Sequence, residues 1–418
     1  MSFENLNLHP LILKAITETG YTSATPIQEK AIPELIAGHD LMASSQTGSG
    51  KTAAFMLPAL NRLVEPSQVA GKGPRILVLT PTRELAQQVS QAAAKYGKYL
   101  KNAKVVTILG GMPYPLQNKL LSQHVDILVA TPGRLIDHIE RGRINFSRLE
   151  MLILDEADRM LDMGFIDDVE RIAGATPESR QTVLFSATLD GAIGKLGATL
   201  TRDPKLIRIA AQTARHENIE QRLHYVDDMS HKNRLLDHML RDVSLNQAIV
   251  FTATKRDADL LADDLLAKGY DAAALHGDMS QRERTRTLTR LRQGGIKVLV
   301  ATDVAARGID VAGITHVINF DLPKFAEDYV HRIGRTGRAG ATGVAISFAS
   351  GRDSMHVRKI ERFTGQTITP HVIDGLEPKF RPRPTVTHKR GYAGKGDFRN
   401  GAPAKRGGER FSRERGNR

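Results

Sequence analysis

The most informative part of the chain reads Met151-Leu152-Ile153-Leu154-Asp155-Glu156-Ala157-Asp158, an apolar run that ends in acids. A short continuous apolar run is typical of a strand that is buried on both faces of a parallel sheet. Carboxylates placed directly after such a strand can hold a metal ion and orient an attacking water. The run therefore predicts a parallel α/β sheet with acidic chemistry at the end of one strand.

A glycine-rich loop lies about a hundred residues earlier, at Thr47-Gly48-Ser49-Gly50-Lys51-Thr52. Backbone N–H groups of such a loop can cradle phosphates, while Lys51 supplies a charge and Thr52 a magnesium ligand. Either motif alone also fits a solvated or flexible turn. Because both occur in this order and each follows a strand-like run, together they predict hydrolysis of a nucleoside triphosphate.

The same strand pattern recurs through the first half of the chain. Apolar runs at 76–79, 127–130 and 183–185 each precede a polar cluster, as the run at 151–154 does. Helix-like stretches such as 84–98 lie between them, which indicates parallel strands joined by crossover helices. Open sheets of this kind bind ligands at the carboxyl ends of their strands, so we expect the polar clusters to lie at one edge.

A second set of strand-like runs follows residue 217. The runs are 248–251, 298–301, 317–320 and 344–347, and no second glycine loop with Lys-Thr accompanies them. One half is therefore predicted to bind nucleotide and the other to contribute different groups. We expect domains at 1–208 and 218–375, a linker at 209–217 and a tail at 376–418.

Composition restricts the class of protein. The chain has 418 residues, of which 41% are apolar, which suits two domains plus an extension. It has no cysteine, so neither disulfides nor thiolate metal sites are available, as fits a reducing cytoplasm. The start has no basic segment or long apolar stretch. We expect a cytoplasmic protein without a membrane segment.

The excess of positive charge is concentrated at the C-terminus. The net charge is +13, and residues 379–418 carry 13 Lys or Arg against three Asp or Glu. A segment rich in Gly, Arg and Pro cannot bury enough apolar surface to fold, so we expect a disordered tail. It is either a solubilising extension or a contact for a polyanion, of which RNA fits best. Four aromatic residues interleave with the charges and could stack on bases: Phe380, Tyr392, Phe398 and Phe411.

From Phe3 to about Ile373 the chain resembles the DEAD-box RNA helicases, and its motifs are similar to those of the bacterial RhlE and SrmB types. The resemblance includes Gly20–Gln28, which is similar to the adenine-reading element of the family, and His331–Arg338 in the second half. It implies two tandem RecA-like parallel-sheet domains joined by a short linker. It also implies ATP and Mg²⁺ as cofactors and RNA as the partner.

The resemblance assigns an ATP site. Ala24 and Ser45 depart from the residues usual in the family, but neither removes the chemistry of its motif. The implied ATP-binding residues are Phe3, Tyr21, Gln28, Ser45, Gln46, Thr47, Gly48, Ser49, Gly50, Lys51, Thr52, Gly308 and Asp310. Phe3 would stack on adenine or simply pack on the first helix, and Gln28 would read the adenine edge.

The resemblance also assigns catalytic and coupling roles. Asp155 and Thr52 would hold Mg²⁺, Glu156 would activate water, and Lys51 would contact the β and γ phosphates. Arg335 and Arg338 would act as arginine fingers, since a planar, permanently charged guanidinium suits a phosphoryl transition state. Coupling between the halves would involve Asp158, Ser186, Thr188, Arg307 and His331. Ser186 and Thr188 could instead cap the next helix.

The implied RNA contacts lie in both halves. In the first half they are Pro81, Thr82, Arg83, Gly110, Gly111, Thr131 and Arg134. In the second half they are Gly277, Gln281, Arg284, Thr302 and Asp303. Such residue types favour the RNA backbone over base edges, so we expect little sequence selectivity.

We therefore predict an RNA-stimulated ATPase that opens short RNA duplexes or remodels RNA–protein complexes, in ribosome assembly or RNA turnover. Partners from the ribosomal precursor or RNA-degradation machinery would fit that role. Two other functions remain open at this point. An ATP-gated RNA clamp would bind RNA with negligible turnover, and a DNA translocase would respond to DNA as well as to RNA.

Overall fold

The computed structural model describes residues 2–44, 48–101, 103–209, 218–306, 311, 313–337 and 341–379. Both sheets described below belong to one compact unit, Met1–Arg381. Most of the expected linker (residues 210–217) and most of the expected tail (from Phe380 onward) lie outside the described residues.

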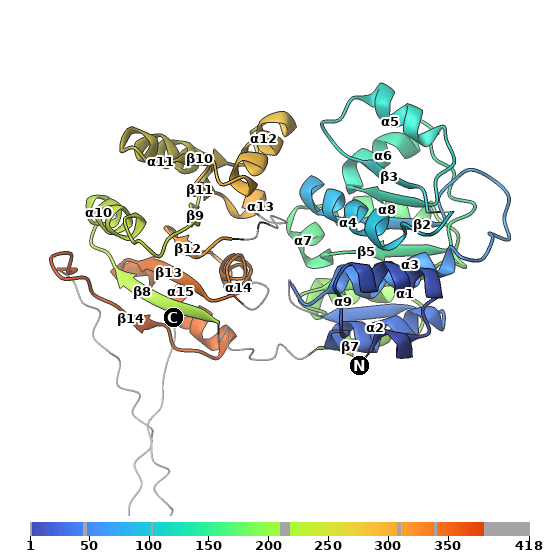
Figure 1. Ribbon diagram of the computed structural model, residues 1–418, viewed down its shortest axis with the longest axis horizontal. Coiled ribbons are helices and arrows are strands. Elements are labelled where there is room, and N and C mark those ends of the chain that lie inside the picture. The colour runs from blue at the N-terminus through green and yellow to red at the C-terminus, as the bar shows by residue number, and fades with distance from the viewer. Residues whose placement is uncertain are drawn as a thin grey trace, which may run out of the picture. The chain divides into compact units, whose positions relative to one another are not determined.

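The first sheet has seven parallel strands in the order β3-β4-β2-β5-β6-β1-β7 (Figure 1). Their bounds are β1 (Leu41–Ser44), β2 (Ile76–Leu79), β3 (Val105–Ile108), β4 (Ile127–Ala130), β5 (Met151–Leu154), β6 (Gln181–Ser186) and β7 (Lys205–Arg208). The accompanying helices are η1 (Phe3–Leu6), α1 (Pro10–Glu18), α2 (Pro26–Ile36), α3 (Lys51–Arg62), α4 (Arg83–Tyr96), α5 (Tyr114–Leu121), α6 (Pro132–Glu140), α7 (Ala157–Asp162), α8 (Ile166–Gly174) and α9 (Gly191–Leu200).

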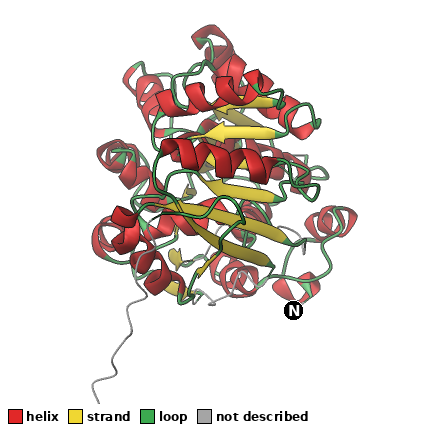
Figure 2. Cartoon of the chain, turned by 90° about the vertical axis from the view of Figure 1, so that its left-hand side faces the viewer, coloured by secondary structure: helices red, strands yellow, loops and turns green. Residues whose placement is uncertain are grey.

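The second sheet repeats this arrangement with the order β10-β11-β9-β12-β13-β8-β14, again all parallel. Its strands are β8 (Ile219–Tyr225), β9 (Ala248–Phe251), β10 (Ala272–Leu275), β11 (Val298–Ala301), β12 (His316–Asn319), β13 (Gly343–Ala349) and β14 (Thr369–Pro370). Helices cover both faces of its strands (Figure 2), and they are α10 (Met229–Leu240), α11 (Lys255–Ala267), α12 (Gln281–Arg292), α13 (Asp303–Ala306), α14 (Ala326–Ile333), η2 (Gly351–Asp353) and α15 (Ser354–Thr364).

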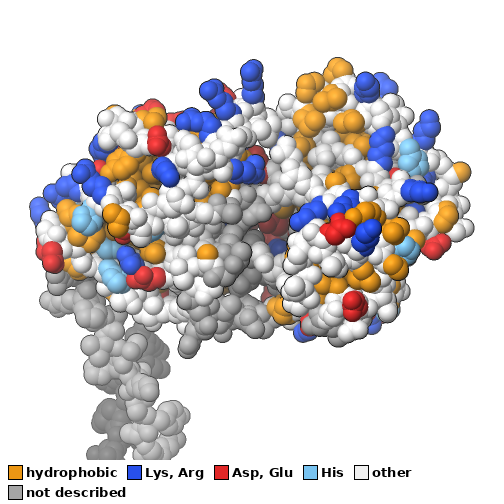
Figure 3. Space-filling view, in the orientation of Figure 1, with side chains coloured by type: hydrophobic (Ala, Val, Ile, Leu, Met, Phe, Trp, Pro, Cys, Tyr) orange, Lys and Arg blue, Asp and Glu red, His pale blue; other side chains and the backbone are white. Residues whose placement is uncertain are grey.

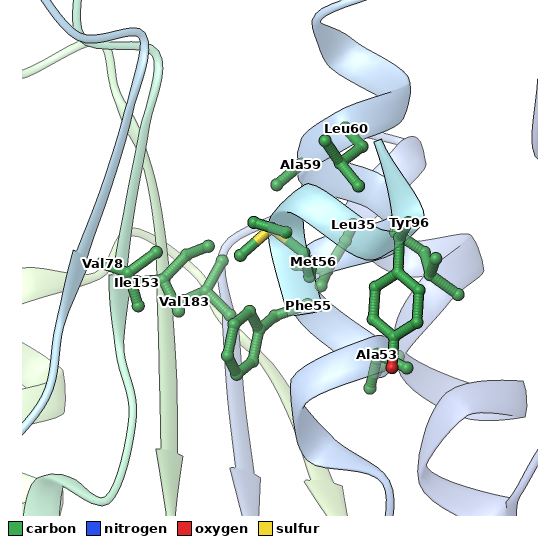
Figure 4. Packing of buried hydrophobic residues seen from close by; sticks show 14 of the residues in the cluster. Leu35, Ala53, Phe55, Met56, Ala59, Leu60, Val78, Tyr96, Ile153 and Val183 are labelled. Atoms are coloured by element: carbon green, nitrogen blue, oxygen red, sulfur yellow. The ribbon is translucent and has the colours of Figure 1, made fainter. Parts of the chain in front are cut away.

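The core of the first domain explains why its strands read as continuous apolar runs. Alternate strand residues point to opposite faces of a sheet, and each face here is covered by a separate apolar cluster. Val78, Ile153 and Val183 pack with Phe55 of α3 on one face (Figure 4). Leu152 and its neighbours pack against the helices of the other face.

The prediction of two tandem parallel-sheet domains is confirmed. The predicted runs at 76–79, 127–130, 151–154, 248–251 and 298–301 coincide with β2, β4, β5, β9 and β11. Five strands were not predicted, namely β3, β7, β8, β10 and β14. Among the helices of the described residues, none combines the length and the apolar character needed to cross a bilayer.

Candidate active site

The polar clusters of the first domain meet at one edge because their strands are neighbours. β5 pairs with β6, and β6 pairs with β1, all in parallel. The acidic segment follows β5, Ser186 ends β6, and the glycine loop leads from β1 into α3. Three motifs distant in sequence therefore share the carboxyl edge of the sheet, where such folds bind ligands.

The glycine loop ends at a helix start suited to an anion. Gly50 is the N-cap of α3 at φ +90°, and no side chain caps the helix. Lys51 and Thr52 therefore begin α3 with backbone N–H groups available to phosphate oxygens. The preceding loop residues Ser45, Gln46 and Thr47 lie outside the described residues.

Gln28 holds this loop in place. Its Oε1 accepts a hydrogen bond from Thr25 N at 2.9 Å, and its Nε2 donates to Gly50 O at 3.1 Å. Thr25 Oγ1 donates to Ser49 O at 2.8 Å. A Cβ on Gly50 would lie 2.4 Å from Gln28 Nε2, so only glycine fits. Gln28 is 1% exposed, and both ends of its amide are occupied by protein groups.

Tyr21 is the exposed member of the aromatic group beside the loop. It is 40% exposed, whereas Phe3 is 4% exposed and lies behind it with ring centroids 6.1 Å apart. The Tyr21 and Tyr96 hydroxyls are 3.1 Å apart, which fixes the orientation of the Tyr21 ring. In this arrangement Tyr21 offers a stacking surface and Phe3 supports it.

Glu156 is the most distinctive residue of the acidic segment. It is buried, adopts the left-handed region at φ +56°, and accepts a hydrogen bond from Arg159 Nη1 at 2.6 Å. Burial alone would raise the pKa of Glu156, but the charges of Arg159, Lys51 and Arg335 outweigh burial and lower this pKa to about 2. Glu156 is therefore ionised throughout the physiological range.

Asp155 shows the opposite behaviour. Burial raises the pKa of its carboxyl to about 7, with Glu156 and Asp158 adding repulsion that Lys51 only partly offsets. Its buried Oδ1 has no hydrogen-bond partner in the described part of the chain. An unsatisfied carboxylate oxygen beside a phosphate loop fits a hard divalent cation such as Mg²⁺, with the Thr52 hydroxyl as a second oxygen ligand.

Two groups of the second domain lie near this site. The charge of Arg335 lowers the pKa of Glu156, and His331 is close enough to interact with the same carboxyl, so the end of α14 lies near the acidic segment. Arg335 Nε donates to His331 O at 3.1 Å, and burial holds the pKa of His331 well below its ordinary value. The other four second-domain residues of the expected ATP and coupling sites lie outside the described residues: Arg307, Gly308, Asp310 and Arg338.

Of the coupling residues of the first domain, Ser186 is buried at the end of β6, and Thr188 follows it at a half-buried position. Ser186 Oγ accepts a hydrogen bond from Thr188 N at 3.3 Å, and Ser44 Oγ donates to Ala187 O at 2.8 Å. The N-cap of α9 is Asp190, so Ser186 and Thr188 do not cap that helix. Asp158 Oδ1 is buried and has no hydrogen-bond partner among the described residues.

Arg83 organises the expected RNA residues of the first domain. Its guanidinium lies against Gly110 and Gly111, where added Cβ atoms would lie 3.2 and 2.8 Å from it. Arg134 Nη1 donates to Met112 O at 3.0 Å, and its guanidinium lies 4.2 Å from the Tyr114 ring centroid. Three further expected contacts, Pro81, Thr82 and Thr131, lie at the starts of α4 and α6, where Thr82 and Thr131 are the N-caps.

Two of the expected RNA residues of the second domain, Gln281 and Arg284, contact α4 of the first domain. Arg83 Nη1 donates to Gln281 Oε1 at 3.0 Å, and Arg284 Nε donates to Glu84 Oε1 at 2.8 Å. Gly277 lies next to Lys255, and Thr302 is buried at the end of β11.

Asp303 is held in a way that the sequence did not reveal. Its two oxygens accept from Arg332 Nε at 2.5 Å and Arg332 Nη2 at 2.7 Å. A bidentate pair of this kind fixes the position of a carboxylate. Asp303 therefore orients the start of α13, and any contact of its carboxylate with RNA would compete with Arg332.

Three functional residues escaped sequence reasoning. Arg159 and Arg332 neutralise Glu156 and Asp303, and Glu84 pairs with Arg284. Only Arg159 left a signal, because it stands three residues after Glu156 at the start of a helix, a spacing that brings side chains together. The other two pairs join residues that are far apart in the chain.

Comparison with known proteins agrees with this geometry. Residues 25–196 match the DEAD/DEAH box helicase family, and residues 231–340 match the helicase conserved C-terminal domain. ATP-dependent RNA helicase DeaD of Mycobacterium tuberculosis is 48% identical over 376 residues, which are 90% of this chain and 66% of that protein. ATP-dependent RNA helicase SrmB of Escherichia coli is 43% identical over 381 residues, which are 91% of this chain and 86% of that protein.

Solved structures give the same result. Dbp5 of S. cerevisiae bound to RNA and ADP BeF3 superposes with a TM-score of 0.79 at 33% identity, covering 88% of this chain and 95% of that one. Mss116 bound to single-stranded RNA and AMP-PNP gives a TM-score of 0.80 at 30% identity, covering 89% and 79%. The family uses ATP with Mg²⁺, which the donor set around Asp155 fits. The chain belongs to the DEAD-box ATP-dependent RNA helicases.

Proposed function

We propose that this protein hydrolyses ATP in response to RNA and uses the cycle to open short duplexes or to remodel RNA–protein complexes. The chain spans 66% of the length of the DeaD relative, so activities of that protein's remaining third are not transferred. In this proposal residues 1–208 and 218–375 form the two catalytic domains, and residues 209–217 link them. The basic tail at 376–418 would tether RNA, and the working compartment would be the cytoplasm.

The first step is the binding of ATP at the first domain. The start of α3 would hold the β and γ phosphates through Gly48–Thr52, with Lys51 supplying positive charge. Tyr21 would provide the stacking surface for adenine, supported by Phe3. Because both ends of the Gln28 amide bond the protein, reading of adenine by Gln28 would require one of these bonds to exchange.

The second step is the attack of water on the γ phosphate. Asp155 and Thr52 would hold Mg²⁺, which neutralises phosphate charge when it is bound. Glu156 would orient the water and accept its proton, and Arg335 with Arg338 would stabilise charge on the transferred phosphoryl group.

One observation supports this assignment above the others. Glu156 is buried yet ionised, and the cations that keep it so come from both domains: Arg159 and Lys51 from the first, and Arg335 from the second. A site divided in this way is complete only when the domains are together. ATP, which binds groups of both, would therefore favour the assembled state over the separated one.

The Glu156→Gln variant tests the proposal. The amide keeps the size and hydrogen-bonding shape of the side chain but cannot accept the proton, so RNA-stimulated kcat should fall by ~10² or more. ATP-dependent RNA binding should persist. Phosphate release and RNA affinity would be measured on the same preparation, with exposed Glu140→Gln as the control.

Loss of ATP-dependent RNA binding in Glu156→Gln would show that the residue is structural. A wild-type protein that binds RNA tightly with ATP but turns over negligibly would contradict the helicase assignment and favour a clamp.

A further inference from the structure

The outer face of α12 carries charge that the catalytic cycle does not use. This helix of 12 residues contains five arginines and a single acid, Glu283. Arg284 is buried and pairs with Glu84, whereas Arg282, Arg286 and Arg290 are exposed. These three, at spacings of four residues, lie along one side of the helix over ~12 Å, and we call them the arginine stripe.

No acid compensates the arginine stripe. None of its members forms an ion pair within the described segments, although Arg290 Nη2 donates to Gly295 O at 3.3 Å. A hollow of about 540 Å³ beside Arg286 and Arg290 is bordered by three acids. Each acid is already engaged: Glu283 with Ser280 N, Asp278 with Lys255, and Asp259 with His276.

The arginine stripe does not stabilise the helix that carries it. Like charges four residues apart destabilise a helix by ~0.2–0.5 kcal/mol per pair, and Arg282 in the first turn opposes the helix dipole. The helix is held instead by the capping box of Ser280 and Glu283 and by buried Leu288 and Leu291. In neighbouring α11, by contrast, Asp264 pairs with Lys268 four residues later.

The helix also starts at the expected RNA path. Its first residue, Gln281, accepts a hydrogen bond from Arg83 of the first domain at 3.0 Å. The arginine stripe begins at the next residue and leads away from that contact. Figure 3 shows Lys and Arg side chains projecting from the surface where Figure 1 labels α12.

We propose that the arginine stripe binds phosphates of the RNA segment that leaves the core site at Gln281. This inference rests on the proposed function, because it extends the same RNA path. Exposed guanidinium groups suit phosphate oxygens. Because the three arginines lie along one helix face, they could contact successive phosphates of an RNA strand that continues past the core site. The stripe would thus add affinity for a flank and leave the hydrolytic step unchanged.

The experiment compares three RNAs in the full-length protein. One is the shortest strand that saturates RNA-stimulated hydrolysis, and the other two are the same strand extended at the 5′ end or at the 3′ end. The test variant is Arg282→Gln/Arg286→Gln/Arg290→Gln. The matched control, Arg352→Gln/Lys359→Gln/Arg362→Gln, removes the same charge from exposed positions of η2 and α15 in the same domain.

The test variant should keep wild-type hydrolysis and affinity with the short strand. It should lose the affinity gained from one of the two extensions, and its salt dependence on that RNA should be shallower by up to ~2, at ~0.7 per phosphate contact. The control should retain the gain. The single Arg286→Gln variant should show a partial loss, which guards against misfolding of the triple variant.

Three results would overturn the inference. If the test variant still gains full affinity from both RNA extensions, the arginine stripe does not bind RNA and would suit an acidic protein surface instead. An equal loss of RNA affinity in the control variant would show that the effect comes from net charge alone. An equal loss of affinity for the short strand in the test variant would place the arginine stripe inside the core site. Absence of RNA-stimulated hydrolysis in the wild type would instead contradict the proposed function itself.

Discussion

At the scale of single residues, the site depends on how buried charges are balanced. Glu156 and Asp155 are adjacent and both buried, yet Glu156 has a pKa near 2 and Asp155 a pKa near 7. The difference arises because Arg159 lies 2.6 Å from Glu156 while Asp155 Oδ1 has no partner in the described chain. Glu156 is thereby kept ionised and able to orient water, and Asp155 keeps an oxygen free for a cation.

Replacing Arg159 by glutamine should move the acid limb of the activity profile. Without this cation burial dominates, the pKa of Glu156 rises, and the carboxylate protonates at a higher pH. Activity should then be lost at a higher pH as the solution is acidified. RNA-stimulated kcat measured against pH would show the shift, with exposed Arg171→Gln as the control.

An acid limb that stays in place in Arg159→Gln would contradict the role given to Arg159. A uniform fall in kcat at all pH values, without a shift, would mean that Arg159 supports the fold and does not tune Glu156.

His224 should make the second domain sensitive to acid. Burial, with smaller effects of His371 and Arg222, lowers the pKa of His224 to about 4 from 6.5. Because the folded pKa is depressed, the unfolded chain binds more protons between these values, so stability is full above pH 6.5 and is lost as pH falls toward 4. The loss should reach up to ~3 kcal/mol at ~1.4 kcal/mol per pKa unit.

The measurement is chemical unfolding of wild type and His224→Phe between pH 4 and 7. The phenylalanine ring preserves packing against Phe348 and cannot titrate, so the variant should lose less stability on acidification. Equal losses in the two proteins would contradict the assignment of this proton to His224.

At the scale of elements, the sequence predicts strands better than contacts. The apolar run at 151–154 predicts β5 because a strand that is buried on both faces of a sheet must be apolar throughout. β3 and β7 were missed because Thr107, Lys205 and Arg208 interrupt their apolar character at exposed or half-buried positions. The acidic box and the glycine loop were recognisable because their chemistry is local.

The pairs that hold the site together were not predictable in the same way. Asp303 and Arg332 lie on different elements, α13 and α14, and no local rule connects them. The burial of Phe3 behind Tyr21 depends likewise on how η1 packs on the rest of the domain.

Gly343 at the start of β13 should control the arginine segment that follows α14. An added Cβ there would lie 2.3 Å from Thr336 Oγ1 and 2.7 Å from Gly337 N, so this turn and Arg335 would have to move. Gly343→Ala should lower kcat by ~10² or more, since small displacements of a catalytic group are costly. RNA affinity without nucleotide should remain.

Steady-state hydrolysis and RNA binding would check this expectation, with Gly174→Ala as the control because nothing lies within 4 Å of its Cβ. Wild-type kcat in a correctly folded Gly343→Ala protein would show that the turn does not position Arg335.

At the scale of the whole molecule, the proposed hydrolysis depends on assembly of a divided site. Glu84 and Arg284 form a buried ion pair between α4 and α12, and the charges on Glu156 come from both domains. Breaking a buried pair is costly because it leaves a charge without a partner. We therefore expect the assembled state to form and separate as a unit, favoured by ligands that contact both domains.

The chain has no cysteine, so Lys30→Cys and Val243→Cys would allow specific labelling of one exposed position in each domain. The direct measurement is energy transfer between the two dyes with a non-hydrolysable ATP analogue, with RNA, and with both. We expect the distance to shorten markedly only when both ligands are present. A distance that is the same in all four conditions, including the free protein, would contradict assembly of a divided site.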